Sequence, residues 1–310
     1  MKHTVQFREL CWVAALLTLA CGLAFAPDLY LPMLARAFLL QWSFFFAIVT
    51  LFLLIKRRWW SAWSALFGAV LILVQVPKPF VEAIPIGTGA TLRILHMNVL
   101  QPNGEFDRAI QQSITSNADV ISVQEVGPEW AEALTVGLRE IYPYAHVEPR
   151  TNCYGIALFS KRPFVRVRTV LVQHSPFIEA VVDVEGTPVR LFAVHATSPI
   201  SYAHFRKRND QLGELAAYLA QSDTATVLVG DLNTVPWDRS FQRFCRDARM
   251  YSTTASEQRT WPSVGPLALI PLDHLLLSKG IVPASIRTVD ISGSDHRGLV
   301  ADVRIAPHES

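Results

Sequence analysis

Asp231 and Asn233 are two polar side chains whose types and spacing could do chemistry. They follow the aliphatic run of residues 226–229, and residues two apart on an extended chain project to the same side. A carboxylate and an amide aimed at one point can orient a water molecule or bind a phosphate group. The same pair can also form an ordinary Asx turn that closes a strand, so it leaves the function open by itself.

Further polar residues stand at or beside the ends of other predicted strands. They are Asn98, Glu125, His195, Asp273, Asp295 and His296. Each has an ordinary explanation, such as a turn former or a solvated side chain. Eight such residues in this order are improbable as coincidence, which favours one shared site.

The elements that must position these residues follow from the spacing of apolar side chains. Helices are predicted at residues 107–117 and 202–219. Strands are predicted at residues 93–99, 119–126, 154–160, 165–172, 178–184, 189–195, 226–229, 272–277 and 300–305. Direct strand-to-strand connections alternate with connections through a helix, which predicts an α/β (α+β) domain with mixed sheets.

Three apolar spans without charged residues precede this domain, at residues 10–26, 37–55 and 59–76. Each is about as long as a helix needs to cross a bilayer, so residues 1–76 are predicted to form a membrane anchor with three transmembrane helices. A signal peptide, a cleavage site before Cys21 and a buried hairpin are the alternatives. Prolines and glycines indicate a linker at 77–90, followed by a catalytic domain at 91–308.

Basic residues predict the orientation of the anchor. Lys2 and Arg8 precede the first span, and residues 56–58 between the second and third spans are all basic. Both groups should therefore be cytoplasmic. The expected location is the inner (cytoplasmic) membrane, multi-pass, with the catalytic domain facing the periplasm or cell exterior.

Charge and cysteine content narrow the class of substrate and exclude common zinc motifs. The sequence is 51% hydrophobic and 17% charged; after residue 84 it has 21 basic and 23 acidic residues, a formal charge of −2. This balance argues mildly against a long nucleic acid as substrate. The four cysteines lack zinc-site spacing. Cys153 and Cys245 could form a disulfide or remain free thiols.

Seven motifs together resemble the endonuclease/exonuclease/phosphatase superfamily, the deoxyribonuclease I-like proteins, over residues 91 to about 306. They are LHMN (95–98), VQE (123–125), YGIALFSK (154–161), VHATS (194–198), GDLN (230–233), LDH (272–274) and GSDH (293–296). The resemblance implies a four-layer sandwich of two mixed β-sheets flanked by helices. It also implies an active site at one edge of that sandwich.

A metal site is the first consequence of the resemblance. Glu125 would be the principal ligand, with Asn98 and Asp295 beside it. Oxygen ligands without thiolates suit a hard ion, so Mg²⁺ is expected, with Mn²⁺ as a possible substitute.

The resemblance also implies catalytic roles. Asp231 would orient or deprotonate the attacking water, and Asn233 would help to hold the phosphate. His296 would bind a phosphate oxygen or act as the base, with its ring oriented by Asp273.

His195 resembles the histidine of the deoxyribonuclease and sphingomyelinase branches, where apurinic endonucleases have a tyrosine. Glu179 matches a carboxylate that pairs with that histidine, which would keep it charged for protonating the leaving group. Glu179 could equally be a surface position. Tyr154, which opens its motif, is the remaining candidate catalytic residue.

Three functions are compatible with these features. A membrane-tethered phosphoesterase would hydrolyse a phosphoester or pyrophosphate of a lipid-linked substrate at the bilayer, a layout that resembles teicoplanin-resistance membrane phosphatases of this superfamily. A membrane-anchored nuclease is the alternative, favoured by the basic residues 206–208, which could equally be a solvated helix face. A catalytically inactive binding domain is disfavoured because no ligand or base is missing. No protein partner is implied.

Overall fold

The computed structural model describes residues 2–76, 89–253, 257–264 and 268–306. By internal contacts the chain divides into two units, Met1–Lys78 with Pro236–Arg239, and Pro79–Val235 with Ser240–Ser310. The predicted linker at 77–90 lies almost wholly outside the described residues.

Four helices make up most of the first unit: α1 (Lys2–Phe25), α2 (Tyr30–Arg36), α3 (Leu39–Ile55) and α4 (Trp59–Leu73). Helix α4 packs against α1 and α3 through a face of small residues that includes Ala65, Gly68 and Ala69. A Cβ added to Gly68 would lie 2.7 Å from the Phe46 ring. Small residues here let the helix backbones approach closely.

Helix α2 lies between the first and second predicted apolar spans. Its last residue, Arg36, is buried and donates hydrogen bonds from Nη1 to the carbonyl oxygens of Leu23 and Ala24, at 2.8 and 2.7 Å. These carbonyls belong to the last turn of α1, where helix geometry leaves them without intrahelical donors. Arg36 thus caps α1.

The described helices are not all long enough to confirm the prediction of three membrane-spanning helices. Within the described residues, Gln6–Phe25 is long and apolar enough to cross a membrane, and α2 with α3 pass together but are bent by 65°. Helix α4 has 15 residues and ends at Leu73, so it is about 22 Å long, short of a hydrocarbon core of about 30 Å. The charge-free run continues to residue 76, but the helix does not.

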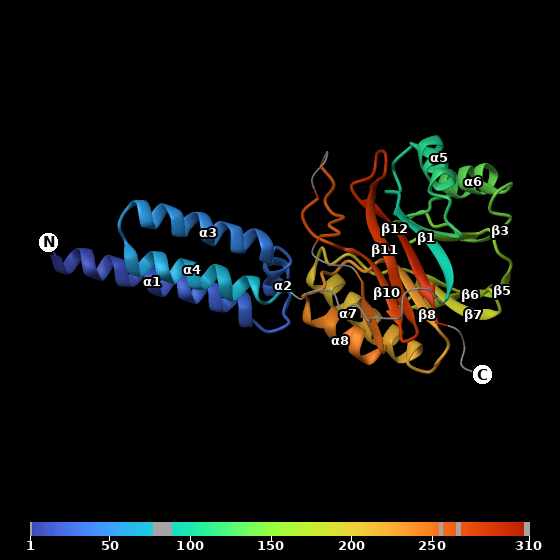
Figure 1. The fold of residues 1–310 in the computed structure, drawn as a ribbon. Coiled ribbons are helices and arrows are strands. Elements are labelled where there is room, and N and C mark those ends of the chain that lie inside the picture. Colours follow the sequence, from blue (N-terminus) through green and yellow to red (C-terminus); the bar gives the residue numbers. More distant parts are fainter. Residues whose placement is uncertain (1, 77–88, 254–256, 265–267, 307–310) are drawn as a thin grey trace. The chain divides into compact units, whose positions relative to one another are not determined.

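The second unit is built from two six-stranded sheets (Figure 1). The first has the order β11-β12-β1-β2-β4-β3. Its strands are β1 (Ala90–Asn98), β2 (Val120–Gln124), β3 (Tyr144–Glu148), β4 (Ile156–Ser160), β11 (Ile281–Asp290) and β12 (Arg297–Ile305). Strands β1 and β2 are parallel and their neighbours are antiparallel, so the sheet is mixed as predicted.

The second sheet has the order β5-β6-β7-β8-β10-β9. Its strands are β5 (Phe164–Val172), β6 (Ser175–Val184), β7 (Thr187–His195), β8 (Thr226–Asp231), β9 (Met250–Ser252) and β10 (Asp273–Ser278). Here β7 and β8 are the parallel pair. Both parallel pairs are joined through a helix, as parallel strands require.

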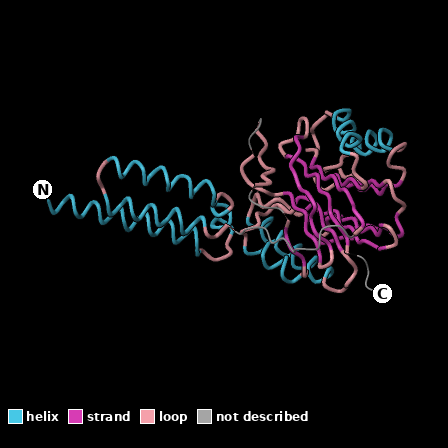
Figure 2. The backbone as a smooth tube through the Cα atoms, viewed as in Figure 1, coloured by secondary structure: helices cyan, strands magenta, loops and turns pink. Residues whose placement is uncertain are grey.

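Three apolar clusters define the layers. One, with Ile94, Ile178, Val227 and Ala301, lies between the two sheets. A second joins the outer face of the first sheet to α5 (Phe106–Ser116) and α6 (Pro128–Leu138), and a third joins the second sheet to α7 (Tyr202–Leu219) and α8 (Arg239–Asp247). Figure 2 shows these helices flanking the strands. The predicted four-layer sandwich is therefore confirmed.

The predicted strands and helices are found in this unit with shifts of a few residues at their ends. Strands β3, β9 and β11 and helices α6 and α8 were not predicted. Cys153 and Cys245 are free thiols, each partly exposed.

Candidate active site

Strand register brings the predicted polar residues to one edge of the sandwich. Asn98 pairs with Gln124, immediately before Glu125, at the ends of β1 and β2. Asp231 at the end of β8 lies opposite His195 of β7 on one side and Asp273 of β10 on the other. Asn98 of the first sheet donates a hydrogen bond to Asp231 of the second, so both sheets contribute side chains to one place.

Asp273 is a fully buried carboxylate held between two histidines. His96 Nε2–H donates to Oδ1 at 2.6 Å, and His296 Nδ1–H donates to Oδ2 at 2.8 Å. Burial alone would raise the pKa of Asp273, but the charge and hydrogen bond of His296, with the hydrogen bond from His96, hold it well below its usual range. Asp273 is thus ionised and fixes both imidazole rings.

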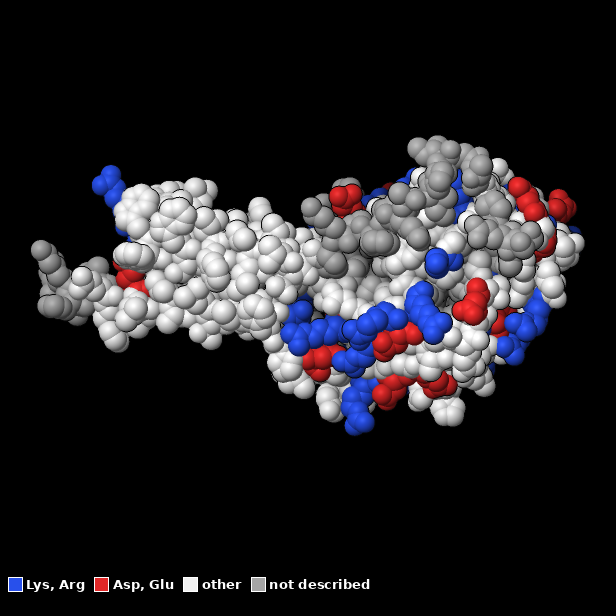
Figure 3. Space-filling view, turned by 60° about the horizontal axis from the view of Figure 1, so that its bottom comes forward, with Lys and Arg blue, Asp and Glu red and all other residues white. Residues whose placement is uncertain are grey.

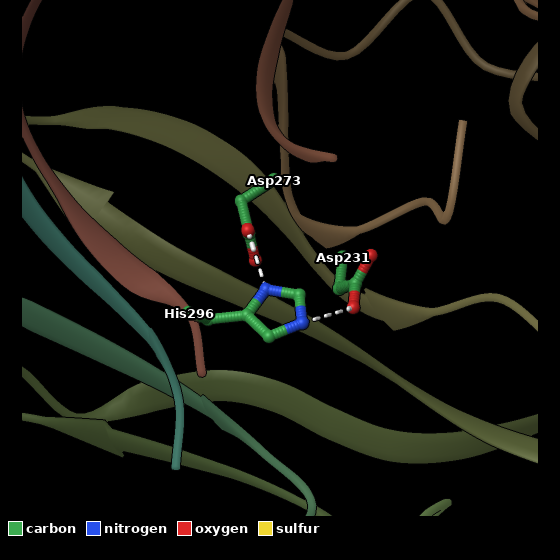
Figure 4. A group of neighbouring side chains, drawn as sticks. All are labelled: Asp231, Asp273 and His296. Atoms are coloured by element: carbon green, nitrogen blue, oxygen red, sulfur yellow. Dashed lines mark hydrogen bonds and ion pairs between the residues drawn. The ribbon is translucent and has the colours of Figure 1, made fainter. Parts of the chain in front are cut away.

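His296 lies between Asp273 and Asp231 (Figure 4). Its Nε2 is 3.7 Å from Asp231 Oδ2. Burial would lower the pKa of His296, but the charges of Asp273 and Asp231 outweigh burial and raise the pKa to about 10. The ring is therefore an imidazolium at neutral pH.

Asp231 Oδ2 is the atom on which the site converges. It faces His296, accepts a hydrogen bond from Asn98 Nδ2 at 3.2 Å and lies 3.7 Å from His195 Nε2. Burial and the charge of Asp273 raise the pKa of Asp231, whereas the charge of His296 lowers it. A carboxylate with a raised pKa is a stronger base than an ordinary aspartate.

The loop after β8 is held by its own backbone and by buried side chains behind it. Asn233 N–H donates to Asp231 Oδ1 at 2.8 Å, and Asn233 Nδ2 donates to the carbonyl of Ala196 at 3.0 Å. Arg208 Nη1 donates to the carbonyl of Asn233, and the next carbonyl in the loop accepts from His274 Nε2. Asn233 has φ 49°, a left-handed conformation that asparagine tolerates.

Gly230 allows this loop to start beside β7. It has φ +156°, and a Cβ there would lie 1.9 Å from the carbonyl oxygen of Val194. No side chain fits such a close approach, which explains why glycine precedes Asp231 in the motif.

Glu125 and Asn98 form the oxygen-rich side of the site. Asn98 Nδ2 donates to Glu125 Oε1 at 3.1 Å, and the backbone N–H of Gln101 donates to Glu125 Oε2 at 3.0 Å. Glu125 has φ 64°, a costly conformation for a residue with a long side chain. Such strain at a strand end is typical of functional positions.

Asp295 is attached to the same region through its neighbour. Ser294 Oγ donates to the backbone carbonyl of Asn98 at 2.7 Å, while Asp295 Oδ2 accepts from Trp261 Nε1 at 3.0 Å. Glu125, Asn98 and Asp295 supply carboxylate and amide oxygens without a thiolate, a donor set that suits a hard divalent cation. The charge of Glu125 also raises the pKa of Asp231, a repulsion that a cation would relieve.

A second group of possible metal ligands is Asp231, Asp273 and His296, whose ligand atoms lie within 4.8 Å of one another. Both oxygens of Asp273 already accept hydrogen bonds from histidines, and His296 Nδ1 is the donor of one of them. As an imidazolium, His296 would also have to lose a proton before it could bind a metal ion. The arrangement suits proton transfer and phosphate binding better than metal coordination.

His195 is buried at the end of β7, beside Tyr154. The two ring centroids are 5.7 Å apart. Burial and the nearby charge of His296 lower the pKa of His195 to about 4. His195 is therefore neutral at pH 7, whereas the sequence predicted a charged ring. Burial also raises the pKa of Tyr154, so its hydroxyl stays protonated.

The predicted pairing of Glu179 with His195 is wrong. Glu179 faces Phe192 across the β6–β7 ladder, and His195 is three residues further along β7, so the two side chains point to opposite faces of the sheet. Glu179 instead accepts hydrogen bonds from Arg168 and Arg190, both at 2.7 Å, and from Tyr218. It is a structural counter-ion on the helix-covered face.

Three residues of the site were missed by the sequence prediction. His96 had a signal, because it lies two residues before Asn98 on one strand and so shares its face. Arg208 belongs to the basic run 206–208, which the sequence assigns to a phosphate backbone or a solvated helix face, yet it is buried behind Asn233. Trp261, the partner of Asp295, lies outside any predicted element.

The comparisons with known proteins concern the second unit, which holds this site. The Endonuclease/Exonuclease/phosphatase family profile matches residues 95–296. An endonuclease/exonuclease/phosphatase from Beutenbergia cavernae is similar at 19% identity, with 70% of this chain and 72% of that chain covered and a TM-score of 0.57. Sphingomyelinase C from Streptomyces griseocarneus is similar at 18%, with 68% and 99% covered and a TM-score of 0.53.

D. rerio TDP2 in complex with a single-strand DNA product is another similar structure, at 14% identity, with 69% and 99% covered and a TM-score of 0.56. At identities this low, the structural similarity shows a shared fold alone. The search of curated proteins by sequence found no match.

The fold and the site define a metal-dependent hydrolase of phosphoric esters. The chain belongs to the endonuclease/exonuclease/phosphatase family, since the profile covers most of its length. Enzymes of this family use divalent metal ions.

Proposed function

We propose that this enzyme is a membrane-attached, Mg²⁺-dependent phosphoesterase that hydrolyses a phosphoester or pyrophosphate of a lipid-linked substrate. The observation that carries the proposal is the convergence of His195, His296 and Asn98 on one oxygen of Asp231. Such an arrangement can activate water on one side and stabilise phosphoryl oxygens on the other.

Asp231 is the base in this proposal. The His296 imidazolium and a cation beside Glu125 would favour its ionised form, and the carboxylate can then accept a proton from the attacking water. The imidazolium of His296, fixed by Asp273, stabilises the negative charge that develops on the phosphoryl oxygens. Neutral His195 donates a hydrogen bond to the phosphoryl group, which replaces the predicted role as a charged acid.

Glu125, Asn98 and Asp295 would hold the metal. Mg²⁺ bound by these residues would neutralise the non-bridging oxygens of the phosphoryl group. Asn98 also bonds to Asp231, so the same amide links the metal side of the site to the base.

The apolar character of the N-terminal helices supports attachment to a membrane. Large apolar side chains on α3 and α4 are exposed, among them Phe44 (69%), Leu51 (61%) and Trp60 (75%). Figure 3 shows a long side of this unit with almost no charged residues, whereas the catalytic unit carries both signs. A helix that is apolar all round suits lipid better than water. We propose the inner membrane, with the catalytic domain on the periplasmic or outer side.

A nuclease is the second candidate, because a TDP2 complex with single-strand DNA has a similar fold. The basic run that favoured this function is divided in the structure. Arg206 is exposed, Lys207 is half-buried beside Tyr154, and Arg208 is buried. Three side chains in such different positions do not form a track for a phosphate backbone, so the lipid substrate is preferred.

The test is a substrate panel for the full chain in detergent, with Mg²⁺ or with a chelator. It contains a polyprenyl monophosphate, a polyprenyl pyrophosphate, sphingomyelin, and single-stranded and duplex DNA. Mg²⁺-dependent turnover of a lipid substrate is expected. Turnover of DNA alone would make the enzyme a nuclease, and a lack of metal-dependent turnover on every substrate would refute the proposal.

A further inference from the structure

A hollow of about 240 Å³ lies on the helix-covered face of the second sheet, against β5, β6, β7 and the end of α7. Its walls include three arginines, one from each of two positions on β5 and one from β7, together with a carboxylate and a phenol: Arg166, Arg168, Arg190, Glu179 and Tyr218. None of these residues takes part in the candidate active site. The cluster therefore needs an explanation of its own.

Strand register separates this hollow from the active site. Arg190 pairs with Thr226 at the start of β8, whereas His195 pairs with Asp231 at its end. Five residues of strand span about 17 Å, and residues an odd number apart point to opposite faces of a sheet. A ligand held by Arg190 would thus be remote from the reacting atoms.

The charges in the hollow do not balance. Glu179 accepts hydrogen bonds from Arg166 Nη2 at 3.3 Å, from Arg168 Nε at 2.7 Å and from Arg190 Nε at 2.7 Å. Among the described residues that line the hollow, Glu179 is the one carboxylate. One negative charge faces three guanidinium groups, which leaves a local surplus of two positive charges in a domain whose formal charge is −2.

The guanidinium groups also retain unused donors. Each carries five N–H groups, and one carboxylate cannot accept from all of them. Arg166 and Arg168 have exposed side chains. Arg190 is 6% exposed, and its Nη1 is a buried donor without an acceptor within the described part of the chain. A buried donor in this state indicates a missing partner such as an ion or water.

Aromatic rings fix the most buried of the three arginines. The Arg190 guanidinium lies 4.6 Å from the ring centroid of Phe192 and 5.1 Å from that of Tyr218, whose hydroxyl donates to Glu179 at 2.7 Å. A guanidinium held against rings keeps its edges for hydrogen bonds in its own plane, the geometry that phosphate oxygens match. A cation that is already held in place loses less conformational entropy on binding a ligand.

We propose that this hollow is a binding site for a phosphate group, separate from the active site, with Arg166, Arg168 and Arg190 as its ligands. A phosphate monoester carries a charge of about −1.5 to −2 at pH 7, which matches the surplus of two positive charges. The phosphate belongs to a soluble phosphorylated compound or to a phospholipid headgroup. The site does not depend on the proposed reaction, and its ligand is bound without being hydrolysed.

The test is equilibrium dialysis of labelled inorganic phosphate against the full chain in detergent, with a chelator and at constant ionic strength. Arg166→Gln and Arg168→Gln should each weaken phosphate binding at one site at least about tenfold, as for loss of a charge-assisted hydrogen bond. Arg139→Gln, which removes an exposed arginine just after α6, should match the wild type. His296→Ala should keep this site. Melting temperatures verify that each variant is folded.

Unchanged phosphate binding in folded Arg166→Gln and Arg168→Gln would overturn the inference, because the cluster would then serve only to neutralise Glu179. Loss of all phosphate binding in folded His296→Ala would overturn it too, since the active site would be the only phosphate site. Hydrolysis of a nitrophenyl phosphoester with Mg²⁺ should keep its kcat/KM in Arg168→Gln. A large loss in a folded variant would contradict a separate site.

Competitors identify the source of the phosphate. Glycerol 3-phosphate and phosphatidic acid have the same phosphate monoester, but only the second carries acyl chains. Equal displacement through Arg168 would assign the site to a soluble phosphorylated compound, and stronger displacement by phosphatidic acid would assign it to a headgroup. Displacement by acetate at the same concentrations as by glycerol 3-phosphate would contradict a phosphate site.

Discussion

Asp273 determines which histidine of the site carries a charge. It contacts His296 directly at 2.8 Å, and this ion pair keeps His296 protonated despite burial. His195 has no such contact: its Nε2 is 3.7 Å from Asp231 Oδ2, and burial and the charge of the His296 imidazolium lower its pKa. Two histidines a few ångströms apart therefore have pKa values on opposite sides of neutrality.

His195→Ala tests this difference. A neutral ring that donates a hydrogen bond to the phosphoryl group stabilises the transition state whatever the leaving group, at about 10² in rate. The variant should therefore lose similar factors on a nitrophenyl ester and an alkyl ester, measured as kcat/KM. A loss confined to the alkyl ester would show instead that His195 protonates the leaving oxygen.

The pH profile provides a second measurement on the same variant. With a pKa of about 4, His195 keeps its charge state between pH 5 and 9. The profiles of wild type and His195→Ala should therefore be parallel in that range. An acidic limb near pH 6.5 that disappears in the variant would contradict the neutral assignment.

At the scale of elements, Glu179 joins β5, β6, β7 and α7 through Arg168, Arg190 and Tyr218. Burial would raise the pKa of Glu179, but these hydrogen bonds and charges lower it. Because the pKa of Glu179 is lower in the folded state, its contribution to the free energy of unfolding is full at pH values above its ordinary pKa of about 4.3. That contribution is lost as the pH falls through the folded-state pKa.

Glu179→Gln should therefore destabilise the domain at neutral pH by about 3 kcal/mol, because Arg190 is left buried without its counter-ion. The difference from wild type should shrink as the pH falls below about 4. Denaturant unfolding at several pH values measures it, with Glu185→Gln in an exposed turn as the matched control. Hydrolysis should be spared, since Glu179 lies on the face opposite His195. A large loss of activity in a stable variant would restore the predicted pairing.

The same elements show what the sequence could predict. Strands β2 and β8 and helix α7 could be predicted because the spacing of apolar residues within each segment indicates its secondary structure. Strand β11 is half exposed and contains Pro283, and β9 has three residues, so neither has a recognisable apolar pattern. Glu179 was misassigned because its strand partner, and therefore its face, depends on a register that one sequence does not specify.

At the scale of the whole molecule, we propose that the first unit attaches the protein to the membrane and that the second unit catalyses hydrolysis. Lys2 and Arg8 before the first apolar span and the basic residues 56–58 before α4 favour the cytoplasmic side. For the catalytic domain to lie outside the membrane, as we propose, the charge-free run 59–76 must cross the bilayer although α4 ends at Leu73. Protease added to intact spheroplasts should digest this domain. Resistance that persists until the cells are lysed would reverse the topology.

The central claim is that Glu125 and Asn98 hold the metal while Asp231, Asp273 and His296 do the chemistry around it. It is tested most directly by hydrolysis of a nitrophenyl phosphoester against Mg²⁺ concentration for wild type, Glu125→Gln and Asp231→Asn. Glu125→Gln should need at least about tenfold more Mg²⁺ for half-maximal rate, because a carboxylate ligand is lost. Asp231→Asn should lower the maximal rate by about 10² or more at an unchanged Mg²⁺ requirement. The reverse pattern, with the Mg²⁺ requirement moved by Asp231→Asn and not by Glu125→Gln, would place the ion in the Asp231, Asp273 and His296 group and contradict the account.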